Sequence, residues 1–148
     1  MHIRRILAAV DGSNPSLNAS TFAIDLAKRF DAELIVLHVI DPRYRELEIA
    51  ISPRPGRFKE IQKKAMEEAE KILDTVRLKA TDKNVNVKMD AISGFTSVVK
   101  DIVRYAKVNN ADMIVIGNRG MTGFKKLLVG SVASGVVTYS DCPVLVVK

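Results

Sequence analysis

The sequence predicts an α/β fold made of one domain over residues 1–148, with a single open five-stranded parallel sheet and helices on both faces. Short apolar segments alternate four times with longer segments in which apolar residues recur every three or four positions, and a fifth apolar segment follows. One of the short segments, residues 33–40 (ELIVLHVI), is almost continuously apolar, as a strand covered on both faces requires.

The first strand is expected at residues 3–10, IRRILAAV, directly before the turn-forming segment DGSNPS. A helix should follow and run to about Phe30. We expect Asn14 to cap this helix and Pro15 to occupy its first turn, where a missing N–H costs little.

After the strand at residues 33–40, residues 41–57 contain three prolines and one glycine. We expect this stretch to be irregular, and to be either mobile or a lid. The elements beyond it are a long amphipathic helix from Phe58, a strand at 85–92, a helix ending at Asn109 or Asn110, a buried strand MIVIG at 113–117, a helix at about 131–140 and a closing strand at 142–148.

The composition, 47% apolar and 27% charged residues, is typical of a soluble globular protein. No apolar run approaches the roughly 18 residues that span a bilayer, and the apolar run near the start is too short for a signal peptide. Cys142 is the sole cysteine, which excludes an internal disulfide. We therefore expect a cytoplasmic protein without membrane association.

Two strand ends carry unusual residues. The first strand is followed by Asp11, and the fourth ends at Gly117 in the segment IGNRG. In an open parallel sheet, ligands bind beyond the carboxyl ends of the strands, where the winding direction reverses. Both ends line one crevice if the strand order is 3-2-1-4-5, and we predict that order.

The stretch between the fourth strand and the last helix is rich in glycine. Gly117 allows a sharp turn, and Gly120 leaves backbone N–H groups open to a phosphate oxygen. Gly130 and Ser131 stand where the helix begins, so unpaired N–H groups and the positive end of the helix dipole favour an anion there. Ser131 is expected either to cap this helix or to bind phosphate. Positive charge is supplied nearby by Arg119, Lys125 and Lys126.

A simpler interpretation stays open for each of these residues alone. The glycines can be ordinary turn glycines, Ser131 an ordinary cap, and the basic side chains solvated. The combination, placed between a buried strand and a helix, favours a phosphate site.

The pattern Gly117, Gly120, Gly130, Ser131 (Gly, two residues, Gly, nine residues, Gly, Ser) resembles the ATP-binding signature of the universal stress protein family. The resemblance extends over nearly the whole chain, through the segments ILAAVDGS, LIVLHVID, ADMIVIGNRG and CPVLVVK. It implies an adenine nucleotide alpha hydrolase-like fold with strand order 3-2-1-4-5, homodimers, and membership of the ATP-binding subclass.

The resemblance also assigns residues to the ligand. It implies phosphate and ribose contacts at the four signature positions and a further phosphate contact at the backbone of Val132. Asp11 would line the nucleoside pocket, and Val39 would offer backbone groups to the adenine. The full set expected to bind the cofactor is Ala9, Val10, Asp11, Val39, Gly117, Arg119, Gly120, Gly130, Ser131 and Val132.

Other signatures of nucleotide chemistry are missing from the sequence. A P-loop has Lys and then Ser or Thr after its last glycine, and this chain has GSV at that place. The dinucleotide fingerprint Gly-x-Gly-x-x-Gly is also missing. His38 lies within an apolar strand and is expected to be a satisfied core residue. We name no catalytic residue. Asp11 is the one candidate to touch Mg²⁺ or Mn²⁺ bound through the phosphates.

The leading functional prediction is an ATP-binding sensor or regulator of the stress response that acts on an unidentified protein partner. The alternative is an enzyme, a slow ATPase or nucleotidyl-transfer enzyme that uses the same pocket. The net charge of +6 favours anionic partners, but Lys and Arg are scattered and the tyrosines do not cluster, so a nucleic acid is an unlikely ligand. A homodimer is expected through the closing strand, whose apolar edge invites pairing.

Overall fold

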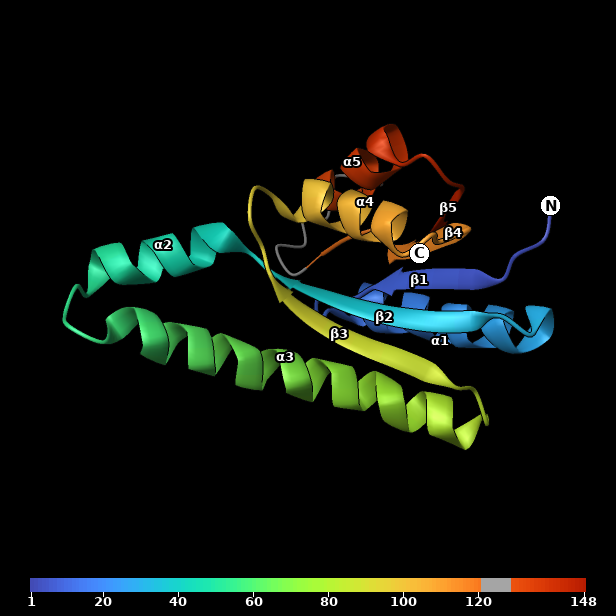
Figure 1. Ribbon diagram of the computed structural model, residues 1–148, viewed down its shortest axis with the longest axis horizontal. Coiled ribbons are helices and arrows are strands. Elements are labelled where there is room, and N and C mark those ends of the chain that lie inside the picture. The colour runs from blue at the N-terminus through green and yellow to red at the C-terminus, as the bar shows by residue number, and fades with distance from the viewer. Residues whose placement is uncertain (121–128) are drawn as a thin grey trace.

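The computed structural model describes residues 1–120 and 129–148, and it has the predicted five-stranded parallel sheet in the order β3-β2-β1-β4-β5 (Figure 1). The strands are β1 (Arg5–Ala9), β2 (Glu33–Ile40), β3 (Val87–Ser93), β4 (Met113–Gly117) and β5 (Val144–Val147). The helices are α1 (Asn14–Phe30), α2 (Pro42–Ile51), α3 (Arg57–Asp82), α4 (Val98–Val108) and α5 (Ser131–Tyr139).

The sheet is covered on both faces, as the apolar strands require. Helices α1 and α3 pack on one face, and α4 and α5 pack on the other (Figure 1). Successive residues of β1 point alternately into the two layers: Ile6 and Ala8 belong to the first core, and Leu7 and Ala9 to the second. All four side chains are at least 94% buried, so the central strand is held by both layers.

The prediction of an irregular segment at residues 41–57 is wrong, because α2 occupies Pro42–Ile51. The side chain of Asp41 caps this helix by accepting a hydrogen bond from the Arg43 N–H (2.9 Å). Pro42 stands in the first turn, where proline breaks no helical hydrogen bond. The other two prolines follow the helix, so they limit its length without preventing it. Together α2 and the first half of α3 form an arm that projects beyond the sheet (Figure 1).

The cap of α1 also differs from the expectation. Ser13, not Asn14, is the N-cap, and its Oγ accepts a hydrogen bond from the Ser16 N–H (3.4 Å). Pro15 lies in the first turn, as predicted. The difference moves the start of the helix by one residue and brings its first turn closer to Asp11 at the end of β1.

None of the helices in residues 1–120 and 129–148 has the length and apolar character needed to cross a membrane.

Candidate functional site

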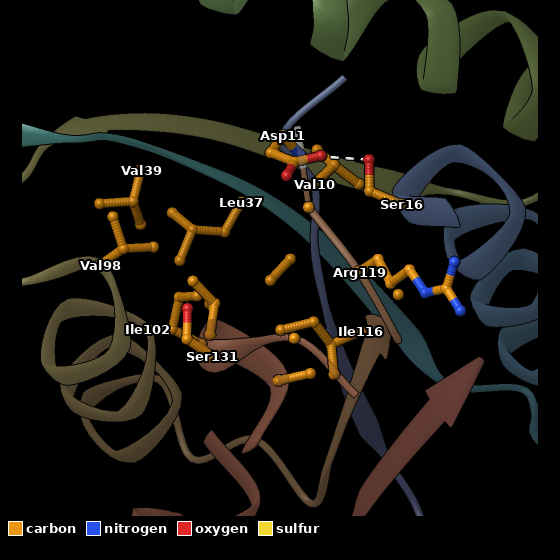
Figure 2. A pocket seen from close by; sticks show the side chains of 16 residues that line it. Val10, Asp11, Ser16, Leu37, Val39, Val98, Ile102, Ile116, Arg119 and Ser131 are labelled. Carbon is orange, nitrogen blue, oxygen red and sulfur yellow. Dashed lines mark hydrogen bonds between the residues drawn. The ribbon is translucent and has the colours of Figure 1, made fainter. Parts of the chain in front are cut away.

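A cavity of about 400 Å³ opens at the carboxyl edge of the sheet, where β1 and β4 end (Figure 2). All ten predicted site residues line it. The remaining lining residues were not predicted and are Ser16, Leu37, Val98, Ile102, Ile116 and Ala133.

The strand order explains where the cavity lies. β1 pairs with β2 on one side and with β4 on the other, so that Ala9 lies level with both Leu37 and Ile116. The chain leaves β1 toward α1 on one face of the sheet and leaves β4 toward α5 on the other face. The connections therefore diverge, and a crevice remains between them, as the winding reversal predicts.

The turn after β1 is fixed by its own polar groups. Oδ1 of Asp11 accepts hydrogen bonds from the backbone N–H (2.9 Å) and the hydroxyl (2.5 Å) of Ser13. The Asp11 N–H in turn donates to Oγ of Ser16 at 3.2 Å. Gly12, with a φ of 86°, supplies the left-handed backbone that this turn needs. The carboxylate of Asp11 is thus held at the rim of the cavity.

Two glycines at the end of β4 are required by close approach. A Cβ on Gly117 would lie 2.7 Å from the carbonyl carbon of Pro15 and 2.8 Å from the Ser16 N, so β4 touches the first turn of α1. A Cβ on Gly120 would lie 2.8 Å from Oδ2 of Asp11. The absence of side chains at these positions keeps the ends of β1 and β4 in contact.

The start of α5 is held by the backbone. The Gly130 N–H donates to the Asn118 carbonyl at 2.6 Å, and Gly130 is the N-cap of α5. No side chain caps this helix within the described part of the chain. Of our two expectations for Ser131, a helix cap or a phosphate contact, the first is therefore wrong. Ser131 is the first helical residue and is exposed at the cavity. The first N–H groups of α5 thus face the cavity at the positive end of the helix dipole.

Arg119 lies at the other side of the opening. Its Nε is buried and has no hydrogen-bond partner among the described residues. In Figure 2 its guanidinium points away from Val39 and Val98. Lys125 and Lys126, the other two basic residues expected near the phosphates, lie outside the described residues.

One wall of the cavity is apolar. Val39 and Leu37 come from β2, and Val98 and Ile102 come from α4 (Figure 2). The signal for these residues was present in the sequence as the inward faces of a strand and a helix. That signal predicted burial, and only the assembled sheet shows that these residues line a cavity.

Two expectations about polar residues can be compared with the structure. His38 is half-buried, and its Nδ1 lies 2.8 Å from the Val10 carbonyl, so this ring is a hydrogen-bonded part of the fold. The described residues contain no group of three or more His, Cys, Asp or Glu side chains placed to hold a metal ion. A divalent ion at this site would therefore need oxygen ligands from a bound phosphate in addition to Asp11.

The fold and site together define a doubly wound α/β protein with a cavity at its topological switch point. The chain belongs to the universal stress protein family, whose model matches residues 2–148. Universal stress protein MJ0531 from Methanocaldococcus jannaschii is 35% identical over 145 residues, covering 98% of this chain and 82% of that protein. Universal stress protein YxiE from Bacillus subtilis is 34% identical, covering 97% and 98%.

Solved structures share the fold. Hypothetical protein MJ0577 superposes with a TM-score of 0.81 at 30% identity, covering 100% of this chain and 97% of that chain. A universal stress protein from Archaeoglobus fulgidus in complex with dAMP has a TM-score of 0.73 at 23% identity over 100% of both chains. Another universal stress protein, in complex with cAMP, has a TM-score of 0.71 at 23% identity, covering 100% and 98%. Because both of these structures are only 23% identical to this chain, they show a common fold and nothing further.

Proposed function

We propose that this protein binds an adenine nucleotide in the cavity between β1 and β4 and acts as a nucleotide-dependent sensor or regulator. One observation carries the proposal: a single cavity is lined both by an apolar wall from β2 and α4 and by the start of α5, where no side-chain cap bond is present in the described structure. A nucleotide combines the two matching kinds of surface, a flat and mostly apolar base and charged phosphates. The volume of about 400 Å³ lies within the range of pockets that hold small ligands.

The phosphates would lie at the start of α5. There the N–H groups of Ser131 and Val132 and the Ser131 hydroxyl can donate to phosphate oxygens. Gly120 and Gly130 present only backbone on this side, which lets the phosphate chain approach closely. Arg119 adds a positive charge at the opening.

The base would lie against Val39 and Val98. Consecutive carbonyls of a strand point to opposite neighbours, and the carbonyls of Leu37 and Ile40 bond toward β1 and β3 respectively. The N–H and C=O of Val39 therefore point to the β1 side, beyond the point where β1 has ended. They can form hydrogen bonds with the adenine edge, in agreement with the role that the family resemblance implies.

ATP is the proposed ligand, because the sequence carries the complete spacing of Gly117, Gly120, Gly130 and Ser131. The phosphate oxygens of a triphosphate would also be ligands for Mg²⁺ or Mn²⁺, and Asp11 would be the protein ligand of that ion. The choice of ATP rests on the glycine spacing.

Calorimetric titration of the purified protein with ATP, with and without Mg²⁺, tests the proposal. Gly130→Val should abolish measurable binding. A Cβ there would lie 3.3 Å from the Asn118 carbonyl oxygen, and the larger side chain would project over the helix start. With φ of −70° the change does not strain the backbone, so the fold should survive.

Ser134→Val, one turn further along α5 and exposed, is the matched control and should bind ATP like the wild type. Unchanged affinity in a folded Gly130→Val variant would refute the phosphate assignment. Analysis of the small molecules released on denaturation adds a separate check. Recovered ATP supports a sensor that holds its ligand, and ADP alone supports the enzymatic alternative.

A further inference from the structure

Phe95 is 83% exposed on the loop that joins β3 to α4. Single exposed apolar side chains are common and need no explanation by themselves. The position of this one is unusual, because its loop is held firmly in place and borders the apolar end of the cavity.

One end of the loop is attached to β2 and α2. The Gly94 N–H donates to the Ile40 carbonyl at 2.8 Å. A Cβ on Gly94 would lie 2.6 Å from that carbonyl oxygen and 2.7 Å from Cδ of Pro42. Only glycine fits this contact, so the loop is packed directly against the residue that follows Val39.

The other end is attached to α4. Asp101 is 1% exposed, and its Oδ2 accepts a hydrogen bond from the Phe95 N–H at 2.9 Å. Its Oδ1 accepts from the guanidinium of Arg104 at 2.6 Å. A buried, paired carboxylate therefore fixes the Phe95 backbone, although the ring itself faces solvent.

The two attachments bring the backbone of the Phe95 loop close to residues that adjoin the apolar wall. Val39 precedes Ile40, to which the loop is bonded, and Val98 is three residues after Phe95. In Figure 1 the loop arches from β3 to the start of α4, next to the point where α2 leaves β2. None of the described residues that line the cavity has an aromatic side chain, and the wall of Val39 and Val98 offers the base aliphatic contacts.

We propose that the ring of Phe95 packs against the base of the bound nucleotide and holds it on the Val39 and Val98 wall, with Asp101 as the positioning residue for the loop. This inference rests on the proposed nucleotide binding and adds a residue outside the glycine signature. Aromatic rings stack favourably on nucleobases, and a ring whose backbone is already fixed loses little entropy on binding.

Affinity measurements separate the base from the phosphates. Phe95→Ala should weaken ATP binding about tenfold, the lower part of the range for loss of one stacking partner. It should leave the affinity for inorganic tripolyphosphate unchanged, because that probe has no base. Phe30→Ala is the matched control. Phe30 is 42% exposed at the end of α1, which lies at the opposite edge of the sheet, and this variant should behave like the wild type with both probes.

A fluorescent reporter tests contact directly, because the chain contains no tryptophan. Saturating ATP should quench and shift the emission of Phe95→Trp, and tripolyphosphate should not. The Phe30→Trp variant should respond to neither.

The outcomes distinguish the two proposals. Wild-type protein that binds ATP, with full ATP affinity in Phe95→Ala or no quenching in Phe95→Trp, overturns the role of Phe95 and leaves nucleotide binding intact. Equal weakening of ATP and tripolyphosphate by Phe95→Ala also overturns it, because the effect would then be structural. Wild-type protein that binds no adenine nucleotide overturns both proposals.

Discussion

The Cα of Gly120 lies so close to Asp11 that an added methyl group would be 2.8 Å from the carboxylate Oδ2. The other oxygen of Asp11 accepts hydrogen bonds from the N–H and hydroxyl of Ser13, which orient the carboxylate toward this contact. The end of β1 and the loop after β4 thus meet at a point where no side chain can be added without movement.

Two glycine substitutions should separate stability from ligand binding. Gly120→Ala meets the end of a side chain and should lower ATP affinity about tenfold with little loss of stability. Gly117→Ala meets the backbone of Pro15 and Ser16 and should cost about 1–3 kcal/mol of unfolding free energy through overpacking. Urea denaturation and calorimetric titration of both variants measure the two quantities. Equal effects of both substitutions on stability would contradict this assignment.

Ser131→Ala should affect the ligand and spare the helix. Because Gly130 is the N-cap and no side-chain cap bond is present in the described structure, removal of the hydroxyl should change the unfolding free energy by less than about 0.5 kcal/mol. ATP affinity should fall by about 0.5–1.5 kcal/mol, the value of one hydrogen bond. Ser134→Ala, on the exposed side of the same helix, is the control. A large loss of unfolding free energy with unchanged ATP affinity would indicate that Ser131 caps the helix and does not bind the ligand.

The cap of α2 should be sensitive to acid. The pKa of Asp41 is held below its usual range, chiefly by the hydrogen bond from the Arg43 side chain, with a further contribution from the Arg43 N–H. Since the folded pKa is the lower one, the stabilisation is present above the usual aspartate value of about 4 and is lost as the pH falls through the folded pKa.

An NMR titration that follows the Arg43 amide proton should show this midpoint. Arg43→Ala should raise the midpoint toward the ordinary value, and Asp41→Asn should retain a cap while removing the titration. The same midpoint in wild type and Arg43→Ala would show that the ion pair does not form in solution.

The arm formed by α2 and the start of α3 should respond to the nucleotide. α2 begins at Pro42, with one residue between it and Ile40 at the end of β2, beside the proposed base. Leu47 and Ile51 on α2 are 60% and 70% exposed. We predict slower amide exchange over residues 41–57 with ATP than without it. The C-terminal half of α3, packed on the sheet, serves as an internal reference. Identical exchange of residues 41–57 in both states would exclude a lid.

The closing strand should mediate a homodimer. β5 pairs with β4 alone among the described strands and lies at the edge of the sheet, with Val144, Leu145 and Val146 half-buried. A two-fold partner can pair with this edge and cover it. Sedimentation equilibrium should show a dimer at micromolar concentration, and Val146→Lys should shift it to monomer.

Ser93→Lys, on the opposite edge strand β3, is the control and should remain dimeric. A monomeric wild type would contradict the role of β5.

The sequence was sufficient for the elements whose local signals agree. Residues 33–40 form β2 within the predicted limits, and MIVIG forms β4, because both runs are short, rich in β-branched residues and apolar on both faces, as buried parallel strands require. The strand order was predicted from the hypothesis that the unusual ends of the first and fourth strands share one crevice, and the family resemblance implied the same order, which the structure confirms. The glycine spacing identified four residues that line the cavity, Gly117, Gly120, Gly130 and Ser131.

The tertiary structure decided what depends on contacts between distant segments. α2 forms where three prolines suggested a loop, because Asp41 caps the helix. An ion pair between Glu48 on α2 and Arg57 on α3 attaches the two helices to each other. The apolar wall became part of a site only when β2 and α4 were brought together. The close approach of Gly120 to Asp11 could not be predicted, because a sequence records which residues follow each other and not which backbones touch.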